Sequence, residues 1–201
     1  MSEKLHFKVS AGLKSIIGKE LINDKFIAIF ELVKNSYDAG ARNVTIKFEK
    51  IYSNEPKIYI IDDGKGMSKQ EIIDKWLFVA YSEKRNSTYR DNIKFRRNYA
   101  GAKGVGRFSC DRLGEIVQLF SKTSKDIVVN SVQINWNEFE DADTKEFQTI
   151  EVLYDELQDN LIEDQGTIIK ICGLREVWDR SDLLQLKKSL TQLVNPEANE
   201  N

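Results

Sequence analysis

The chain contains little cysteine and histidine, and these shortages narrow the kinds of site that it can build. Among its 201 residues there are two cysteines, Cys110 and Cys172, and one histidine, His6. The cysteines lack metal-ligand spacing, and a single histidine argues against both a histidine-based zinc site and a histidine-dependent catalytic triad. So few cysteines favour a reducing compartment, and we expect a cytoplasmic location.

Long apolar segments are also missing. No apolar run approaches the roughly 20 residues needed to cross a membrane, and the sequence does not open with a signal-peptide pattern. We therefore expect no membrane partner. Hydrophobic residues make up 41% of the chain and charged residues 31%, which is typical of a folded domain and excludes a disordered chain. The length suits one domain, expected over residues 1–195, with a polar tail over residues 196–201.

Charge is unevenly distributed along the chain. Residues 83–107 carry eight basic and two acidic residues, a net charge of +6, and residues 136–165 carry eleven acidic residues against one lysine, a net charge of −10. We interpret the acidic segment as a solvated surface. The basic segment also contains glycines, so it is a candidate for binding anions.

Hydrophobic periodicity predicts several helices early in the chain and mainly strands afterwards. Helices are expected over residues 10–22, from 23 or 24 to 39, 68–81, 107–114 and 181–193, and strands over residues 43–52, 57–62, 115–122, 126–136, 147–154 and 166–174. The first two strands are expected to form a hairpin. Residues 83–107 lack apolar periodicity and are expected to form a long loop of the functional kind. This order predicts an α+β fold with an antiparallel or mixed sheet and helices on one face.

The segment "ELVKNSYDAGA", residues 31–41, places polar groups in an otherwise apolar helix that Gly40 is expected to end. At about 100° per residue, one arc that we expect to face the core contains Phe26, Ile29, Phe30, Val33 and Tyr37. The polar residues Glu31, Asn35 and Asp38 fall on the opposite side. Taken alone, this pattern fits either a solvated helix face or the wall of a site.

Two glycine-rich segments follow. "YIIDDGKGMS" runs from a strand into Asp62, Gly64 and Gly66, where glycine allows the backbone to approach a ligand closely, although an ordinary Asp-Gly turn gives the same pattern. "AGAKGVGRFS", residues 100–109, has free backbone N–H groups and two cations before a helix, which suits a polyphosphate. Neither the Walker pattern nor the Rossmann glycine pattern occurs in the chain.

The order of these motifs carries a family resemblance. An E-x-x-x-N-x-x-D-A helix, a D-x-G-x-G-M turn, a G-x-x-G-x-G lid and a late G-T-x-I strand occur in sequence between about residues 10 and 175. Together they resemble the ATPase superfamily of gyrase, the large heat-shock chaperone, histidine kinases and MutL (GHKL), which has the Bergerat fold. The resemblance implies a two-layer sandwich of a mixed, mostly antiparallel sheet with helices on one face. It also implies ATP and Mg²⁺ as cofactors, with ATP between the helices and the sheet.

The resemblance assigns roles to individual residues. It implies that Glu31 is the catalytic base that polarises the attacking water, and that Asn35 is the Mg²⁺ ligand. Asp38 supports the pocket, Asp62 accepts a hydrogen bond from the adenine amino group, and Thr167 lies beneath the adenine. The further ATP-binding residues that it implies are Gly64, Gly66 and Met67 around the adenine, Ser82 and Lys84 before the lid, and Gly101, Ala102, Lys103, Gly104, Val105, Gly106, Arg107 and Phe108 in the lid (about residues 83–107) or directly after it.

Three functions stay open on the sequence. The first is an ATP-hydrolysing module of a larger machine, in which ATP drives lid closure and homodimerisation through the N-terminal region. The second is a histidine-kinase catalytic domain, but kinases of that type generally carry asparagine where Glu31 stands. The third is a module that binds ATP without turnover. Because hydrolysing members take a further cation from a downstream transducer domain, we expect an N-terminal fragment of a longer protein. DNA repair and phage defence are candidate processes, with nucleic acid as a candidate partner.

Overall fold

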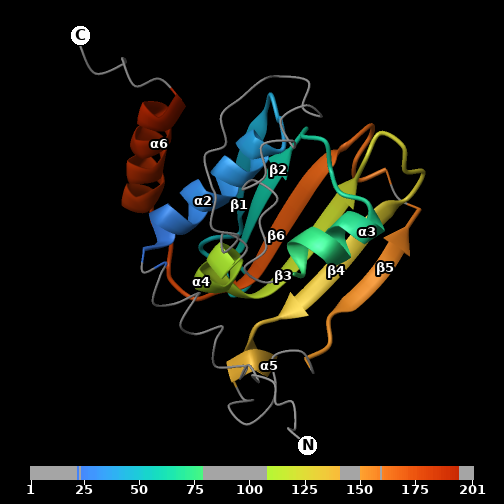
Figure 1. The fold of residues 1–201 in the computed structure, drawn as a ribbon. Helices are drawn as coiled ribbons and strands as arrows, with labels where there is room; N and C mark the ends of the chain where they lie inside the picture. The colour runs from blue at the N-terminus through green and yellow to red at the C-terminus, as the bar shows by residue number, and fades with distance from the viewer. Residues whose placement is uncertain (1–21, 23, 79–107, 141–149, 159, 195–201) are drawn as a thin grey trace, which may run out of the picture.

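A computed structural model describes residues 22, 24–78, 108–140, 150–158 and 160–194 of the chain. The helix expected over residues 10–22 and the loop expected over residues 83–107 therefore fall almost wholly outside the described residues. The remaining segments are sufficient to place the sheet, the helices that cover it and one end of the candidate site (Figure 1).

The sheet has six strands in the order β1-β2-β6-β3-β4-β5. The strands are β1 (Val44–Glu49), β2 (Lys57–Asp62), β3 (Gly114–Lys122), β4 (Val129–Asn135), β5 (Leu153–Leu157) and β6 (Gly166–Leu174). Every strand pair that the structure describes is antiparallel. The expected hairpin between β1 and β2 is confirmed, and β6 lies between β2 and β3 although it comes last in the chain.

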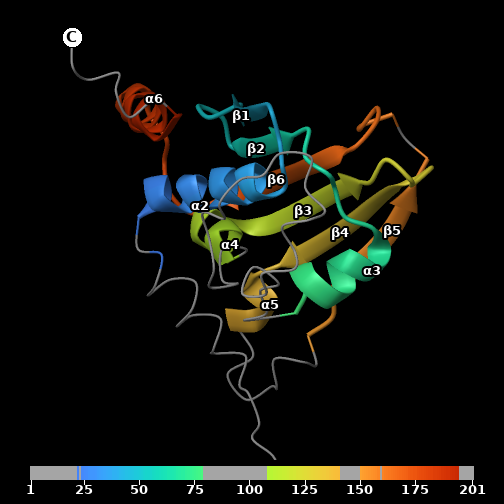
Figure 2. The ribbon, with the colours of Figure 1, turned by 45° about the horizontal axis from the view of Figure 1, so that its top comes forward.

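Helices cover one face of this sheet. They are α2 (Lys25–Asp38), α3 (Lys69–Glu71), α4 (Ser109–Leu113), α5 (Asn137–Glu140) and α6 (Arg180–Val194), and a π-helical turn (Ile72–Trp76) follows α3 directly. In Figures 1 and 2, α2, α3, α4 and α5 lie on the same side of the sheet, and α6 stands beside α2 at the β1 edge. The predicted α+β, two-layer arrangement with helices on one face is confirmed.

The core lies between the sheet and the helices because alternate strand residues point to the covered face. Two rows of apolar side chains cross the four central strands in register, namely Ile60, Ile169, Leu119 and Val132, and Ile58, Ile171, Val117 and Ile134. All of these side chains are buried. Each contributes on the order of 1.5–3 kcal/mol by leaving water. These rows hold the ends of the strands in fixed positions.

Helix α2 begins and ends as the sequence predicts. Asp24 accepts hydrogen bonds from the backbone N–H groups of Phe26 and Ile27, which caps the start of the helix. Gly40 follows the helix end with a φ of 80°, a left-handed conformation that favours glycine. The helix therefore has fixed ends, and its rotation about its own axis decides which residues reach the sheet.

The predicted core face of α2 is wrong in part. The buried residues of this helix are Ala28, Ile29, Leu32, Ser36 and Asp38, whereas Tyr37 is 40% exposed and Phe26, Phe30 and Val33 are only partly buried. Apolar side chains alone indicated a different arc, because the small residues Ala28 and Ser36 face the sheet. At about 100° per residue, Asn35 lies only about 60° from Leu32. The polar face is thus beside the buried arc and not opposite to it.

Some other boundaries differ from the prediction. The strand expected over residues 147–154 appears as β5 at Leu153–Leu157. Of the helix expected over residues 68–81, the described residues 68–78 are α-helical only at α3, before the π-helical turn. Ser68 caps α3, because its side chain and that of Glu71 form a capping box. Strand β4 is shorter than expected, and α5 is a short helix that the sequence did not indicate.

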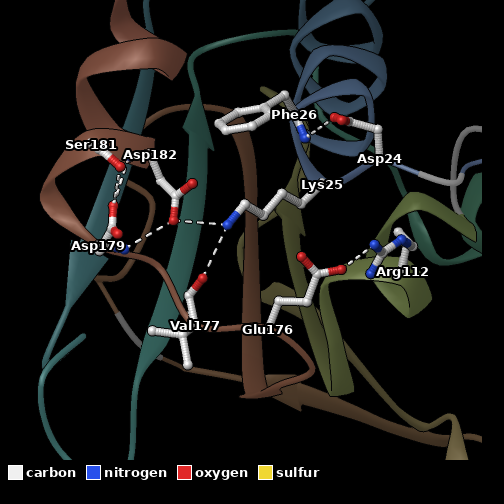
Figure 3. Close-up of polar contacts among 9 residues, drawn as sticks. All are labelled: Asp24, Lys25, Phe26, Arg112, Glu176, Val177, Asp179, Ser181 and Asp182. Atoms are coloured by element: carbon white, nitrogen blue, oxygen red, sulfur yellow. Dashed lines mark hydrogen bonds and ion pairs between the residues drawn. The ribbon is translucent and has the colours of Figure 1, made fainter.

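The connector between β6 and α6, residues 175–179, is attached to two helices at the end of the strands away from Asp62. Figure 3 shows Lys25 of α2 donating to the carbonyl of Val177 at 3.0 Å and pairing with Asp182 at 2.8 Å, while Arg112 of α4 forms an ion pair with Glu176. The contacts of Lys25 hold the start of α6 against the start of α2.

Candidate functional site

The site forms at the end of β2, where a row of polar residues replaces the apolar rows on the covered face. Asp62 is the last residue of β2, and Thr167 of β6 is its partner across the pair. The last turns of α2 lie directly over Asp62, because the Ser36 hydroxyl donates to Asp62 Oδ2 at 2.8 Å. The structure therefore brings together two residues that the sequence placed in the site, Asp62 and Thr167, and adds Ser36, which it did not.

The carboxylate of Asp62 is held from both sides. Its Oδ1 accepts from the backbone N–H of Gly64 at 2.9 Å, while Ser36 donates to Oδ2. Burial raises the pKa of Asp62, and the hydrogen bonds from Ser36, Gly64 and Thr167 oppose that rise only in part. Because the two carboxylate oxygens can accept about four hydrogen bonds together, these three donors leave room for one more. Asp62 is thus a fixed acceptor suited to an amino group on a ligand.

The neighbouring Asp63 stabilises the turn after α2 and does not take part in the site. Its Oδ1 accepts from the backbone N–H groups of Arg42 and Asn43 at 2.7 and 2.9 Å, which holds the turn after α2. Partial desolvation works against ionisation here, but the hydrogen bonds from Asn43 and Arg42 outweigh it and lower the pKa of Asp63. Of the two adjacent aspartates, therefore, only Asp62 faces the site.

The glycine turn after Asp62 packs too closely for side chains. A Cβ on Gly66 would lie 2.0 Å from the carbonyl oxygen of Lys122, and Gly66 also has a φ of 65°. A Cβ on Gly64 would lie 2.9 Å from Asp62 Oδ1, and Lys65 N–H donates to Ala39 O at 3.0 Å. The turn is thereby fixed between the end of α2 and the end of β3.

Ser121 of β3 is a site residue that sequence reasoning missed. Its fully buried hydroxyl accepts from the Met67 backbone N–H at 2.8 Å and lies 3.0 Å from the Thr167 hydroxyl. The available signal was the alternation Val117, Leu119, Ser121, in which a polar residue takes the third covered position. Recognising it required the register of β3 against β6, which periodicity does not give.

The three polar residues of α2 lie on the side of the helix next to its buried arc. Glu31 is about one-third exposed, and its Oε1 pairs with Lys34 Nζ at 2.6 Å. The side-chain amide of Asn35 makes no hydrogen bond to any other residue of the described ranges, and it is half-buried. Asp38 is buried. A carboxylate and an amide oxygen are therefore available on one side of α2.

Several predicted site residues cannot be compared with the structure. Ser82, Lys84 and the lid residues 101–107 lie outside the described ranges. Phe108, the residue after the lid, is buried in the core, where its ring centroid lies 5.7 Å from that of Trp136. The described part of the site consequently consists of the end of β2, the glycine turn and one side of α2.

The arrangement fits the base end of a nucleotide and a single-ligand magnesium site. Asp62 offers an acceptor position, and the Asn35 amide oxygen is of the type that Mg²⁺ accepts alongside phosphate oxygens. Within the described residues, no group of three or more histidine, cysteine, aspartate or glutamate side chains could hold a metal ion. No helix in those same residues is long and apolar enough to cross a bilayer.

A small cavity lies at the opposite end of the strands from Asp62. It has a volume of about 180 Å³ and lies between the β1–β2 hairpin and the connector, with Ile51, Pro56, Arg175 and Trp178 in its lining. Typical ligand pockets start near 300 Å³. This cavity is small for ATP and is remote from Asp62.

Comparisons with known proteins agree with this geometry. The model of a family described as histidine kinase-, DNA gyrase B- and HSP90-like ATPase matches residues 23–167. A segment of 73 residues is 38% identical to the DNA mismatch repair protein MutL of Dictyoglomus turgidum, and 76 residues are 40% identical to MutL of Clostridium botulinum. These segments are 36% and 38% of this chain and 11% and 10% of the relatives. The similarity thus spans about a tenth of the length of these curated relatives.

Proposed function

The chain belongs to the family of histidine kinase-, DNA gyrase B- and HSP90-like ATPases, and from that premise we propose that it is the Mg²⁺-dependent, ATP-hydrolysing module of a larger machine. The family membership supports an ATP-binding module. The observation that carries the proposal is the Asp62 carboxylate at the end of β2. Ser36 and Gly64 hold it in place, and it can still accept one further hydrogen bond.

Asp62 is the group that selects the base. An adenine amino group placed beside it donates to the remaining acceptor position, whereas guanine presents a carbonyl there and would repel the carboxylate. Thr167 lies opposite Asp62 in the register of β2 and β6, so its hydroxyl borders the same base. Gly64 and Gly66 allow the turn after Asp62 to pack closely against Ala39 and Lys122.

Glu31 and Asn35 serve the phosphate end. The Asn35 amide oxygen would hold Mg²⁺, and the bound metal ion supplies charge that stabilises the phosphate oxygens. Glu31 accepts the proton of the attacking water as a general base. Its Oε1 is paired with Lys34, which leaves Oε2 for the water. Because Glu31 occupies the position where histidine kinases of this family carry asparagine, hydrolysis is favoured over transfer to a protein histidine.

The larger machine is proposed by analogy with the relatives. Two of them are named DNA mismatch repair proteins, which favours a DNA-processing assembly over a chaperone. In this proposal ATP closes the lid, two copies of the chain associate through their N-terminal regions, and a downstream domain completes the catalytic site. Binding of ATP without turnover is the second candidate.

The test compares ATP affinity and Mg²⁺-dependent ATP hydrolysis for the wild type, Glu31→Ala and Asp62→Asn. We expect Glu31→Ala to bind ATP within about threefold of the wild type and to lose about 10²–10⁴-fold in kcat. Asp62→Asn should bind ATP about 100-fold more weakly, because an amide opposes the donors that the carboxylate accepts. Glu55→Ala, an exposed change in the hairpin, serves as a control. Turnover by Glu31→Ala at the wild-type rate would contradict the assignment of the base.

A further inference from the structure

We propose that Ser121, Asn130 and Tyr154 are positioning residues for the adenine end of ATP, because their hydrogen bonds fix Met67 and Thr167 beside Asp62. This inference rests on the proposed ATP-binding function and adds residues on three strands that lie away from the recognised motifs. It also adds a prediction about base selectivity that the motifs alone do not make.

The first step is the strand register. On the covered face, the polar row runs directly across five strands and consists of Asp62, Thr167, Ser121, Asn130 and Glu156. The neighbouring rows on that face are apolar across β2, β6, β3 and β4. Polar side chains therefore continue in register from the proposed base-binding residues towards the opposite edge of the sheet.

The second step is that this row holds the glycine turn at both backbone groups of Met67. Ser121 accepts the Met67 N–H at 2.8 Å, and the Asn130 side-chain amide donates to the Met67 carbonyl at 3.4 Å. The same Asn130 amide donates to the Ser121 carbonyl at 3.4 Å. Ser121 also contacts Thr167 at 3.0 Å, so one hydroxyl joins the turn after β2 to the start of β6.

Tyr154 of β5 contacts the amide of Asn130 from the side away from Met67. The Tyr154 hydroxyl lies 2.8 Å from Asn130 Oδ1 and 2.9 Å from a Glu156 carboxylate oxygen. Burial and the Glu156 carboxylate raise the pKa of Tyr154 to about 12, so the hydroxyl keeps its proton at neutral pH. The hydroxyl has one proton for these two acceptors, and the carbonyls of Met67 and Ser121 keep the amide nitrogen of Asn130 on their side, so that Oδ1 faces Tyr154.

The far end of this chain of hydrogen bonds reaches the surface at α3. Lys69 Nζ lies 4.3 Å from the centroid of the Tyr154 ring and 3.8 Å from Glu156. Tyr154 is half-buried on an edge strand, whereas Ser121 and Asn130 are buried. A change at Tyr154 therefore loosens the row without opening the core.

The face of the sheet opposite the helices, called the open face below, supplies a matched control. Gln118 of β3 donates to Gln133 of β4 and accepts from Lys170 of β6, both at 2.8 Å. This row crosses the same three strands as the Ser121 contacts, but it faces away from Asp62. If the covered row only stabilised the sheet, changes in the two rows would have the same effect on nucleotide binding.

The experiment measures the affinities of ATP and GTP by calorimetry for the wild type, Ser121→Ala, Tyr154→Phe and Gln118→Ala, with a melting curve for each. We expect Ser121→Ala to weaken ATP about tenfold and to reduce the preference for ATP over GTP, because the turn and Thr167 lose a shared partner. Tyr154→Phe should weaken ATP about threefold in the same direction. Gln118→Ala should leave both affinities unchanged.

Each outcome decides the inference. Unchanged affinity and selectivity in both Ser121→Ala and Tyr154→Phe, or an equal loss in Gln118→Ala, would overturn it. If Ser121→Ala does not fold, Tyr154→Phe still tests the row, because its change lies on the edge strand. If the wild type binds ATP and Asp62→Asn does not, while these variants behave as the wild type, only this inference fails. A wild type that binds no ATP would remove the proposed function as well.

Discussion

The two faces of this sheet carry polar rows of similar construction with different surroundings. On the covered face, Ser121 and Asn130 are buried and join the strands to the glycine turn. On the open face, Gln118, Gln133 and Lys170 are half-buried and join the strands only to each other. Both rows contain side-chain hydrogen bonds between neighbouring strands, so the presence of such bonds does not distinguish them.

Burial makes the loss of a hydrogen bond more costly in the covered row than in the open row. A buried polar group that loses its partner costs about 1–3 kcal/mol, because water cannot replace the partner. An exposed group exchanges one hydrogen bond for another with water at little cost. The covered row can therefore hold the site in one geometry, and it restricts which residues are tolerated there. The open row places no such demand on the site.

Removing one side chain from each row on β4 tests whether burial makes the covered row more important for stability. Asn130→Ala should lower the free energy of unfolding by about 2 kcal/mol, since the carbonyls of Met67 and Ser121 lose a buried donor. Gln133→Ala should change it by less than about 0.5 kcal/mol. Denaturant titrations of the two variants measure the difference. Equal losses would show that burial does not separate the two rows.

A smaller effect concerns the proton on Asp62. Burial raises the pKa of Asp62, so the folded state takes up this proton at a higher pH than the unfolded state does. Between those two pKa values the folded state binds more protons, and stability therefore increases as the pH falls. We expect the wild type to gain stability relative to Asp62→Asn as the pH is lowered from about 7 towards 4. Thermal melts of both proteins across this range test the sign, and a relative loss would contradict the burial argument.

The sequence predicted the parts of the fold that depend on local pattern. Strand β6 occurs at the expected residues, and both ends of α2 follow from Asp24 and Gly40. Asp62 and Thr167 were also predicted as site residues, and the structure places them opposite each other. These features were predictable because alternation, capping and glycine position are readable over a few residues.

The remaining features depend on how segments far apart in the chain meet. Ser121 and Asn130 look unremarkable in sequence, and only the pairing of β3 with β4 and β6 places them beside Met67. The predicted core face of α2 was wrong in part because it was placed from large apolar side chains alone, whereas Ser36 is buried with its hydroxyl on Asp62. Tertiary contacts, and not local preference, decided these positions.

A titration followed by NMR tests whether the nucleotide binds beside Asp62. Backbone amide spectra would be recorded while a nonhydrolysable ATP analogue is added together with Mg²⁺. We predict that the signals of Gly64, Met67 and Thr167 move and that those of Val177 and Trp178, beside the 180 Å³ cavity, stay in place. Shifts confined to Val177, Trp178 and their neighbours would contradict the account.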